Sequence, residues 1–368
     1  MIKVFEAFAG IGSQAMALRN IGLDFEVVGI SEVDRYALIA YDAIHGNGEP
    51  VEEKTKEEML EEFAKRNVAY NFSTGKSEVP TNEREIKRLY EAHVRSKNYG
   101  DIARINPKEL PDFSLFTYSF PCKNISIAGK QASLEEGSGT QSSLIWECRK
   151  IIQTKKPKYL LMENVKNLVG IKHKPLFDLW CAELEDMGYS NYWKVLNGRD
   201  FGIPQNRERV IMVSILNEGD SWFEMPTSCN KRKELKDIVE EYVDERYYVK
   251  KEDGMLATLT NVMGYEWNNT IIDDTQGFDR DEQNRKIPRI YIGYAPSLRA
   301  LRCGLKVFDP SYNIRKLTPL EYWRLMGYTD EDFNRAKGAG LSNTKLYERA
   351  GRGIVVPMLE AIFSRLLK

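Results

Sequence analysis

The sequence has few of the residues that build disulfide bonds and metal sites, and it has no apolar run long enough to cross a bilayer. Its five cysteines, at positions 122, 148, 181, 229 and 303, show no CxxC spacing, and its histidines are not paired. We therefore expect neither a metal site nor a disulfide framework, and a reducing cytoplasm as the environment. The opening residues 1–6 are typical of a strand and not of a signal peptide.

An excess of charge of one sign is also missing. The chain has 53 Lys and Arg and 54 Asp and Glu, so its formal net charge is -1. This balance neither demands nor excludes nucleic acid as a partner. A DNA-binding protein with so little net charge needs its basic residues gathered on one face. The length of 368 residues exceeds what one compact core usually covers, which favours two domains.

The N-terminal region has the pattern of a strand, a glycine turn and a helix. Residues 2–8 predict a strand and residues 13–20 a helix, with the spacing G-x-G-x-x-A from Gly10 through Gly12 to Ala15. A second strand, residues 25–32, ends in Glu32, where a carboxylate can accept hydrogen bonds from ribose hydroxyls. This combination indicates an adenosine-containing cofactor, although a plain βαβ turn has the same local pattern.

The aromatic run at residues 116–123 predicts a strand that Pro121 stops, with Cys122 at its carboxyl end. Ligands bind at that edge of an open α/β sheet, so the thiol is a candidate nucleophile. The alternative is a buried structural cysteine, because free cysteine is among the most buried residue types. The residues that follow, 123–140, are small, polar and rich in glycine, as in a loop that closes over a substrate.

Two further segments bring polar groups to the same edge. The apolar strand at 157–165 ends in Glu163 and Asn164, and a carboxylate there is costly to bury without a specific role. In the extended segment 201–213, Gln205, Arg207 and Arg209 alternate and so project to one side. An ordinary surface with two arginines is the alternative for that segment.

The remaining segments differ in composition. Residues 46–98 are rich in Lys, Glu and Arg and predict an insertion of exposed helices and loops with a mostly solvated face. From 217 to 314 the α/β alternation stops, and the run at 289–308 is basic and aromatic, which suits contact with phosphates and base edges. Helical pattern returns at 318–326 and at 347–367.

Five motifs occur in order along nearly the whole chain: Phe-Ala-Gly-Ile-Gly (8–12), Ser-Phe-Pro-Cys (119–122), Met-Glu-Asn-Val (162–165), Pro-Gln-Asn-Arg-Glu-Arg (204–209) and Arg-Lys-Leu-Thr-Pro-Leu-Glu (315–321). In these motifs the chain resembles the bacterial DNA (cytosine-5)-methyltransferases of the restriction-modification type. The resemblance implies an α/β fold with a doubly wound, Rossmann-like sheet that binds S-adenosylmethionine (SAM). It also implies a catalytic domain of residues 1–216 plus 336–368, and a smaller, irregular target-recognition domain of residues 217–335.

The resemblance also implies roles for individual residues. Cys122 would attack C6 of a cytosine flipped out of duplex DNA, Glu163 would contact N3 and the amino group, and Arg207 would hold O2. Arg209 and Gln205 would support the loop. The implied cofactor contacts are Phe8, Gly10, Gly12, Glu32, Asp101, Ile102, Pro121, Leu144, Arg352, Gly353 and Ile354. The implied substrate contacts are Lys123, Ser126, Asn164, Arg289, Arg299, Arg302 and Lys306.

Two positions depart from the family pattern, and both add a cation near the reacting centre. Lys123 stands where Gln or Asn is usual, and Arg352 stands in Gly351-Arg352-Gly353 where the family has Asn. An arginine there needs a compensating anion. A ligand carboxylate would make carboxy-SAM the donor and 5-carboxymethylcytosine the product. The methionine carboxylate, a protein acid or a DNA phosphate would leave ordinary methylation in place.

Other classes of protein explain fewer of the motifs. A nicotinamide-dependent oxidoreductase shares the glycine turn and Glu32, but it leaves Cys122, Glu163 and the two arginines unexplained. An RNA cytosine methyltransferase is disfavoured by the long segment at 217–314, and a non-catalytic DNA-binding relative by the presence of Cys122 and Glu163. We expect a monomeric bacterial or phage protein, with double-stranded DNA as partner, a cognate restriction endonuclease in the same cell and no membrane association.

Overall fold

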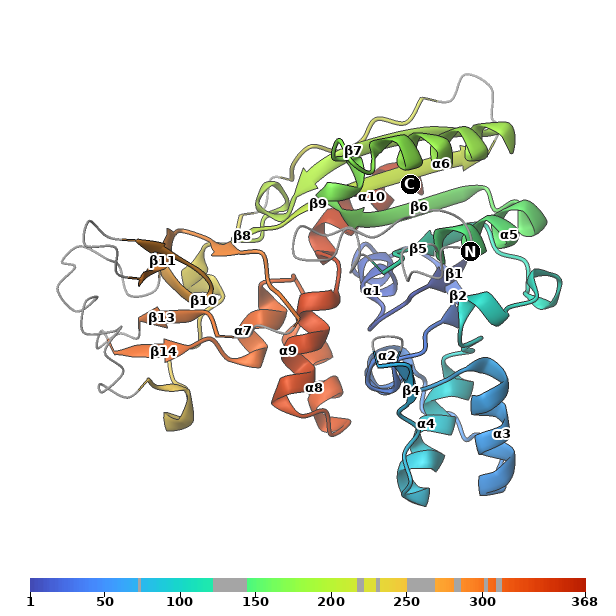
Figure 1. Cartoon of the computed structure of the whole chain (residues 1–368), viewed down its shortest axis with the longest axis horizontal. Coiled ribbons are helices and arrows are strands. Elements are labelled where there is room, and N and C mark those ends of the chain that lie inside the picture. Colours follow the sequence, from blue (N-terminus) through green and yellow to red (C-terminus); the bar gives the residue numbers. More distant parts are fainter. Residues whose placement is uncertain are drawn as a thin grey trace.

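The computed structural model describes residues 1–71, 74–121, 144–216, 222–229, 232–249, 269–280, 286–300, 304–308 and 313–368, with backbone alone at 274–280 and 286–287. A large body contains a six-stranded sheet, and a smaller body contains a four-stranded sheet, at the left of the first view (Figure 1). None of the described helices is long and apolar enough to span a membrane.

The large sheet is mixed, with the strand order β2-β1-β5-β6-β9-β7. Its strands are β1 (Ile2–Ala7), β2 (Phe25–Ser31), β5 (Leu115–Tyr118), β6 (Tyr159–Val165), β7 (Tyr189–Asn197) and β9 (Glu208–Leu216). Neighbours among β2, β1, β5 and β6 are parallel, whereas β9 is antiparallel to both β6 and β7. This arrangement confirms the predicted Rossmann-like α/β fold.

Helices cover both faces of this sheet because its strands are apolar on both sides. On one face, α1 (Ser13–Asn20) and α10 (Val356–Leu366) share a core with Val4 and Leu161. On the other face, α5 (Ile145–Lys155) and α6 (Lys174–Asp186) pack around Phe5.

Short 3₁₀ helices follow several strands or begin loops. They are η1 (Ile102–Arg104), η2 (Pro107–Glu109), η4 (Lys166–Val169), η5 (Gly198–Phe201), η6 (Leu235–Asp237) and η7 (Glu245–Tyr247).

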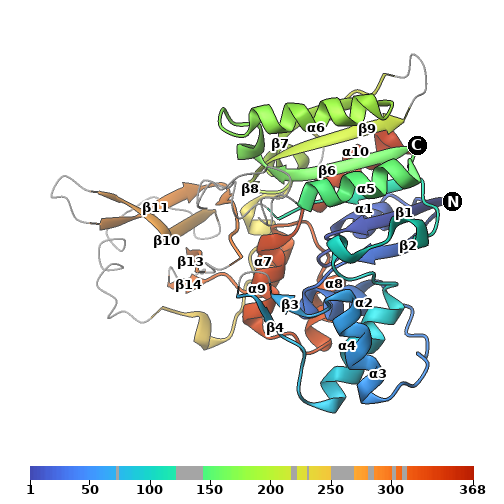
Figure 2. The same cartoon turned by 45° about the vertical axis from the view of Figure 1, so that its right-hand side comes forward.

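The charged insertion is more ordered and more buried than its composition predicts. It contains α3 (Lys56–Arg66), the strand pair β3 (Tyr70–Asn71) and β4 (Lys76–Ser77), and α4 (Glu83–Arg95), which lie beside α2 (Arg35–His45) below the sheet (Figure 2). An apolar stripe on these helices joins one core cluster with α2. Its members include Leu38, Tyr41, Met59, Phe63, Ile86 and Leu89. The expected solvated face is therefore only the outer side of the insertion.

The smaller sheet has the order β11-β10-β13-β14. Its strands are β10 (Thr270–Arg280), β11 (Lys286–Ile292), β13 (Lys306–Phe308) and β14 (Ile314–Lys316). The two bodies meet where β8 (Gln205–Asn206) pairs in parallel with β12 (Ala295–Pro296).

The C-terminal region contains α7 (Pro319–Arg324), α8 (Asp330–Gly338), α9 (Asn343–Arg352) and α10. The continuous helix predicted at 347–367 is two helices, because Gly353 is extended and Pro357 lies in the first turn of α10. The predicted domain boundary at 335/336 falls inside α8. That helix packs on α2, and Asp332 pairs with Arg19 of α1 at 2.7 Å, so it lies with the large body.

Candidate active site

The carboxylate of Glu163 lies at the carboxyl end of β6, between two polar groups from neighbouring strands. Its Oε2 accepts a hydrogen bond of 2.7 Å from the Ser119 hydroxyl, one residue beyond β5. Its Oε1 lies 3.0 Å from Nε of Arg209, at the start of β9. Both carboxylate oxygens therefore have partners in an almost fully buried position.

Asn164 anchors the chain just before the predicted nucleophile. Its Nδ2 donates a 3.0 Å hydrogen bond to the carbonyl of Phe120, and its Oδ1 accepts one from the amide of Val165. Asn164 is 2% exposed, so this contact is a buried tie between the ends of β5 and β6. Asn164 was expected to bind substrate, and in this structure its side chain binds the main chain of Phe120 and Val165. The expected site residues Cys122, Lys123 and Ser126 lie outside the described residues, whereas Pro121 lies within them.

Arg207 does not face the base site as expected. The side chain is buried and donates to the carbonyls of Leu298, Gly351 and Gly353 at 3.1, 3.1 and 2.8 Å. The alternation that should place it beside Arg209 is broken, because β8 ends at Asn206 and β9 begins at Glu208. Arg207 thus joins three separate segments of the chain, and Arg209 occupies the position next to Glu163.

Gln205 is fully buried at the same joint. Its Nε2 donates to the carbonyl of Leu325 at 2.6 Å, and its Oε1 accepts from the amide of Leu298 at 3.2 Å. The amide thereby links β8 to the helical C-terminal region and to the segment after β12. This geometry agrees with the supporting role expected for Gln205.

The glycine turn and the end of the second strand, where the cofactor is expected, are joined by hydrogen bonds to Glu32. The amide of Gly10 donates to Oε2 of Glu32 at 2.8 Å, and Oε1 accepts from the amides of Val33 and Asp34. Burial is the main cause that raises the pKa of Glu32, and the neighbouring Asp34 carboxylate adds to it. The acid is therefore held against the turn by main-chain donors.

The turn is open on one side and closely packed on the other. A side chain at Gly10 would meet no atom within 4 Å, so space lies open in front of that residue, and its φ is +58°. At Gly12 a Cβ would come within 2.3 Å of His45, so this glycine allows the turn to pack on α2. Phe8 adopts a positive φ of 56°, which is a strained conformation for an aromatic residue. An open cradle beside the half-buried acid Glu32 fits SAM.

The predicted adenine contacts are Asp101 and Ile102. Asp101 caps η1 by accepting from the amide of Ala103, and its Oδ2 accepts from Nδ2 of Asn67 at 2.8 Å. Ile102 is buried in the core beside it. Leu144, another expected contact, precedes α5 and packs against the same core cluster.

Arg352 already has protein anions as partners. Its Nη1 lies 3.1 Å from Asp34, and its Nη2 pairs with Glu348. Asp34 also pairs with the buried Arg349 at 2.9 Å. Burial alone would raise the pKa of Asp34, but Arg349 and Arg352 outweigh it and hold that pKa at about 2. Two acids of the protein thus compensate the charge that sets this chain apart from the family pattern.

The residues next to Arg352 are close-packed. A Cβ at Gly351 would come within 2.5 Å of the main chain at Ala300, and one at Gly353 would overlap the hydroxyl of Tyr328. The amide of Ile354 donates to the Ser13 hydroxyl at the start of α1. The segment between α9 and α10 therefore lies directly against the glycine turn.

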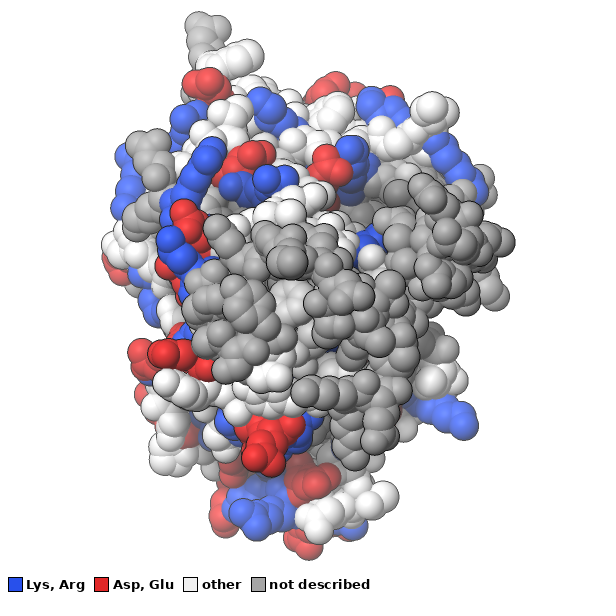
Figure 3. Space-filling view, turned by 90° about the vertical axis from the view of Figure 1, so that its left-hand side faces the viewer, with Lys and Arg blue, Asp and Glu red and all other residues white. Residues whose placement is uncertain are grey.

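The expected DNA contacts divide into exposed and buried residues. Arg289 on β11 and Arg299 after β12 are exposed, and Arg302 lies outside the described residues. Lys306 is only 6% exposed on β13, between β10 and β14, which corrects its assignment to a DNA-facing surface. Figure 3 views the molecule from the side that carries the smaller sheet, where the described Lys and Arg side chains are mixed with acidic ones.

Several residues of the site were missed from the sequence. The half-buried Asp34 pairs with the buried Arg349, and only the N-cap position of Asp34 before α2 gave a local signal. Arg199 stacks over the ring of Tyr294 at 4.2 Å beside the joint of the two bodies, a contact between distant segments. Ser119 lay within a recognised motif but had no assigned role.

Comparison with known proteins agrees with this geometry. The profile of the family described as C-5 cytosine-specific DNA methylase matches residues 78–368. The type II methyltransferase M2.ScrFI of Lactococcus lactis subsp. cremoris is 43% identical, covering 100% of this chain and 99% of that protein. The orphan methyltransferase M.SssI of Spiroplasma monobiae is 32% identical over 99% of this chain and 97% of its own.

Solved structures give the same fold. Dnmt2 methyltransferase of S. pombe matches with a TM-score of 0.63 at 16% identity, over 100% of this chain and 98% of that one. A protein described as a "putative DNA modification methyltransferase", encoded within an E. coli prophage, matches with a TM-score of 0.60 at 14% identity, over 100% of this chain and 98% of that one. The chain belongs to the C-5 cytosine-specific DNA methylase family. It is a DNA cytosine-5 methyltransferase, similar both to a type II methyltransferase and to an orphan methyltransferase.

Proposed function

We propose that this enzyme flips a cytosine out of duplex DNA and methylates its C5 by covalent catalysis, with Cys122 as nucleophile, Glu163 at N3 and Arg209 at O2. The observation that carries the proposal is the placement of Glu163. It lies between Ser119 and Arg209, while Asn164 holds Phe120 two residues before Cys122. Three motifs that are distant in the sequence thereby converge on one edge of the sheet.

The chemistry follows from the poor nucleophilicity of C5 in a neutral cytosine ring. The Cys122 thiolate forms a bond to C6, and the electrons of the C5–C6 double bond move toward C5 and the C4–N3 side. Glu163 contacts N3 and the amino group and shares a proton with N3 as negative charge develops. SAM supplies an electrophilic methyl group. The C5 proton then passes to water, its bonding electrons re-form the C5–C6 double bond and expel the thiolate, and N3 returns its proton to Glu163.

Arg209 has two functions in this scheme. Its Nε holds the Glu163 carboxylate, and its guanidinium retains other donors that can reach a carbonyl oxygen of the base. A base stacked in a duplex cannot reach a carboxylate so deeply buried, which is why the target must leave the helix.

We propose SAM as the donor, bound by Gly10, Glu32 and the Asp101 segment. The carboxy-SAM alternative rests on Arg352 needing an anion and on Lys123 as a possible second cation, which lies outside the described residues. Asp34 and Glu348 supply that anion within the protein. The ion pairs favour ordinary methylation and leave the carboxymethyl product without support.

We further propose that target recognition rests on residues 217–316, which end with β14, and that residues 317–368 belong to the catalytic domain. The position of α8 against α2 supports this boundary. Exposed Arg289 and Arg299 are the described candidates for DNA contact. A monomeric enzyme with a cognate endonuclease stays a prediction.

The decisive experiment combines methyl transfer with covalent trapping. Duplex DNA containing 5-fluorocytosine should form a denaturation-resistant adduct with the wild-type chain and none with Cys122→Ala. Glu163→Gln should retain DNA binding and lose most transfer, because the proton and charge partners of N3 are altered. An adduct that survives Cys122→Ala would refute the proposed nucleophile.

A further inference from the structure

Asn98 connects the two segments of the proposed SAM site. Its Oδ1 accepts hydrogen bonds from the amides of Glu32 and Gly100, each of 3.0 Å. Its Nδ2 donates to the carbonyl of Glu32 at 3.0 Å and lies 3.1 Å from Nδ1 of His93. The side chain is 4% exposed, so these four contacts use the full hydrogen-bonding capacity of a buried amide.

The contacts of Asn98 fix the state of His93. Because Oδ1 faces two main-chain N–H donors, Nδ2 must face the Glu32 carbonyl and His93. The Nδ1 atom of His93 is therefore an acceptor, and its ring proton lies on Nε2, which is 3.7 Å from Oε1 of Glu62. Burial lowers the pKa of His93, in agreement with a neutral ring.

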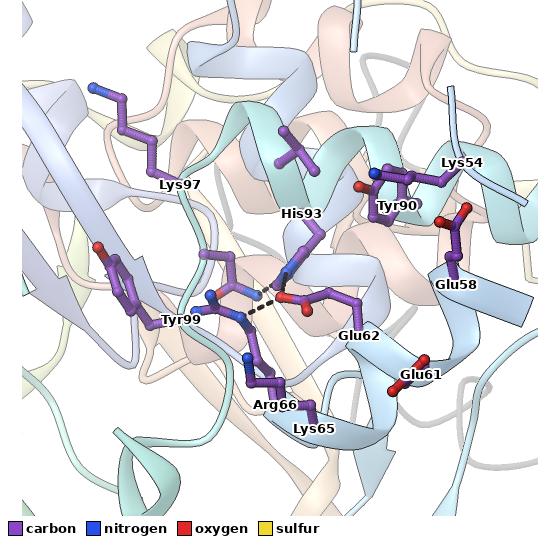
Figure 4. Close-up of a pocket in the computed structure, with 12 residues that line it drawn as sticks. Lys54, Glu58, Glu61, Glu62, Lys65, Arg66, Tyr90, His93, Lys97 and Tyr99 are labelled. Carbon is purple, nitrogen blue, oxygen red and sulfur yellow. Dashed lines mark hydrogen bonds and ion pairs between the residues drawn. The ribbon is translucent and has the colours of Figure 1, made fainter. Parts of the chain in front are cut away.

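The helices of the charged insertion surround this pair. His93 belongs to α4, and Glu62 on α3 also pairs with Arg66, as drawn in Figure 4. The carbonyl of Arg66 accepts the amide of Asp101 at 2.8 Å, and a side chain at Gly100 would come within 2.1 Å of it. Glu62, Arg66, His93 and Asn98 line a cavity of about 470 Å³.

We propose that His93 and Asn98 are positioning residues for SAM, through which the insertion helices hold the Glu32 and Gly100–Asp101 segments in their binding geometry. The inference rests on the proposed function, since it takes Glu32 and Asp101 as SAM contacts. Neither residue touches the reacting atoms. Loss of the pair therefore weakens SAM binding while DNA affinity and the rate at saturating SAM stay unchanged.

Two substitutions at position 93 separate the acceptor from the volume it fills. His93→Asn places an oxygen near the position of Nδ1 and keeps an acceptor for Asn98. His93→Gln fills more of the space but carries its polar atoms near the position of Nε2. We expect His93→Gln and Asn98→Asp to raise the Kd for SAM about tenfold, and His93→Asn to stay within about threefold of wild type. His173→Gln, at a buried histidine before α6, is the matched control and should change nothing.

The full chain is titrated with SAM and with S-adenosylhomocysteine by calorimetry, and KM for SAM and kcat are measured at saturating DNA. The expected result is a KM effect for His93→Gln with kcat within twofold, at temperatures well below the melting point of each variant. The inference is overturned if His93→Gln and His93→Asn bind SAM equally well, or if kcat alone falls. If Asn98→Asp does not fold, the two variants at 93 decide. Failure of the proposed function is distinct, because the wild type would then bind neither ligand or Glu32→Ala would bind both normally.

Discussion

Nε of Arg209 lies 3.0 Å from Oε1 of Glu163, across the junction between β6 and β9. In the antiparallel register Val165 pairs with Arg209 and Glu163 pairs with Ile211, so the two charged residues are diagonal neighbours on the sheet. This contact places Arg209, and not Arg207, beside the Glu163 carboxylate.

Substitution of the two arginines should therefore have different consequences. Arg209→Ala should lower kcat by roughly 10²-fold or more, because a donor aimed at developing charge is lost, while the midpoint of urea unfolding changes little. Arg207→Ala should instead destabilise the fold by about 3 kcal/mol or more, because buried carbonyls lose their donor. Single-turnover methyl transfer and urea titration of both variants measure the two effects. A stable Arg207→Ala without activity, next to an active Arg209→Ala, would reverse the assignment.

Arg352→Asn restores the residue usual in the family and should have a small effect. The side chain is 45% exposed, so its ion pairs with Asp34 and Glu348 should contribute under about 1 kcal/mol. Equal amounts of SAM and carboxy-SAM, with nucleosides read by mass spectrometry, should give 5-methylcytosine from both proteins. A carboxymethyl product that disappears in Arg352→Asn would contradict the donor proposed above.

Glu6 should make folding stability depend on pH. It is fully buried under the glycine turn, bonded to the Tyr41 hydroxyl at 2.7 Å and the Ala15 amide at 3.0 Å. Burial raises the pKa of Glu6 to about 7, although the two hydrogen bonds lower it. The folded state thus binds a proton that the unfolded state has released, so the stability contributed by protonation is complete below about pH 4.5 and is lost as pH rises through 7.

Glu6→Gln should remove this dependence. The variant and the wild type should be similar at pH 5, and the variant should be more stable at pH 8 by up to about 3 kcal/mol. Urea unfolding at several pH values measures the difference, with the remaining titrating groups common to both proteins. A difference that does not change between pH 5 and pH 8 would show that Glu6 titrates normally.

Breaking the buried ion pair of Arg315 and Glu321 should strongly destabilise the folded protein. The two side chains make paired contacts of 2.7 and 3.0 Å and are almost inaccessible to water. Arg315→Ala should lower stability by about 3–5 kcal/mol, because it leaves a buried carboxylate unpaired. The double substitution Arg315→Met with Glu321→Leu should recover much of that loss in denaturant titrations. Equal stability of the single and double variants would argue against an uncompensated charge.

Local signals predicted the fold well wherever neighbouring residues decide the conformation. The helix expected at 13–20 is α1 (Ser13–Asn20), because the glycine turn sets its start and an apolar face continues it. The helix α8 was missed, although Thr329 caps it and accepts from the amide of Asp332. Its identification required the capping pattern and not apolar periodicity.

The site was predictable by residue type but less so by role. Glu163 was found because an acid at the end of an apolar strand is unusual, whereas its partner depended on strand register and on the break between β8 and β9. Lys306 shows the same limit, since composition suggested a basic surface and the register of β13 buries the side chain. Asn98 and His93 had no sequence signal, because their contacts join segments separated by up to 66 residues.

The main-chain contacts of Arg207 also affect how the sequence specificity of such enzymes can change. Three of its hydrogen bonds go to main-chain carbonyls, at Leu298, Gly351 and Gly353. Every residue type has a carbonyl, so side chains in the segment after β12 can mutate without removing the acceptor that Arg207 uses there. Substitutions in the proposed target-recognition region therefore leave this contact intact. New sequence specificities can evolve there while the catalytic domain keeps its geometry.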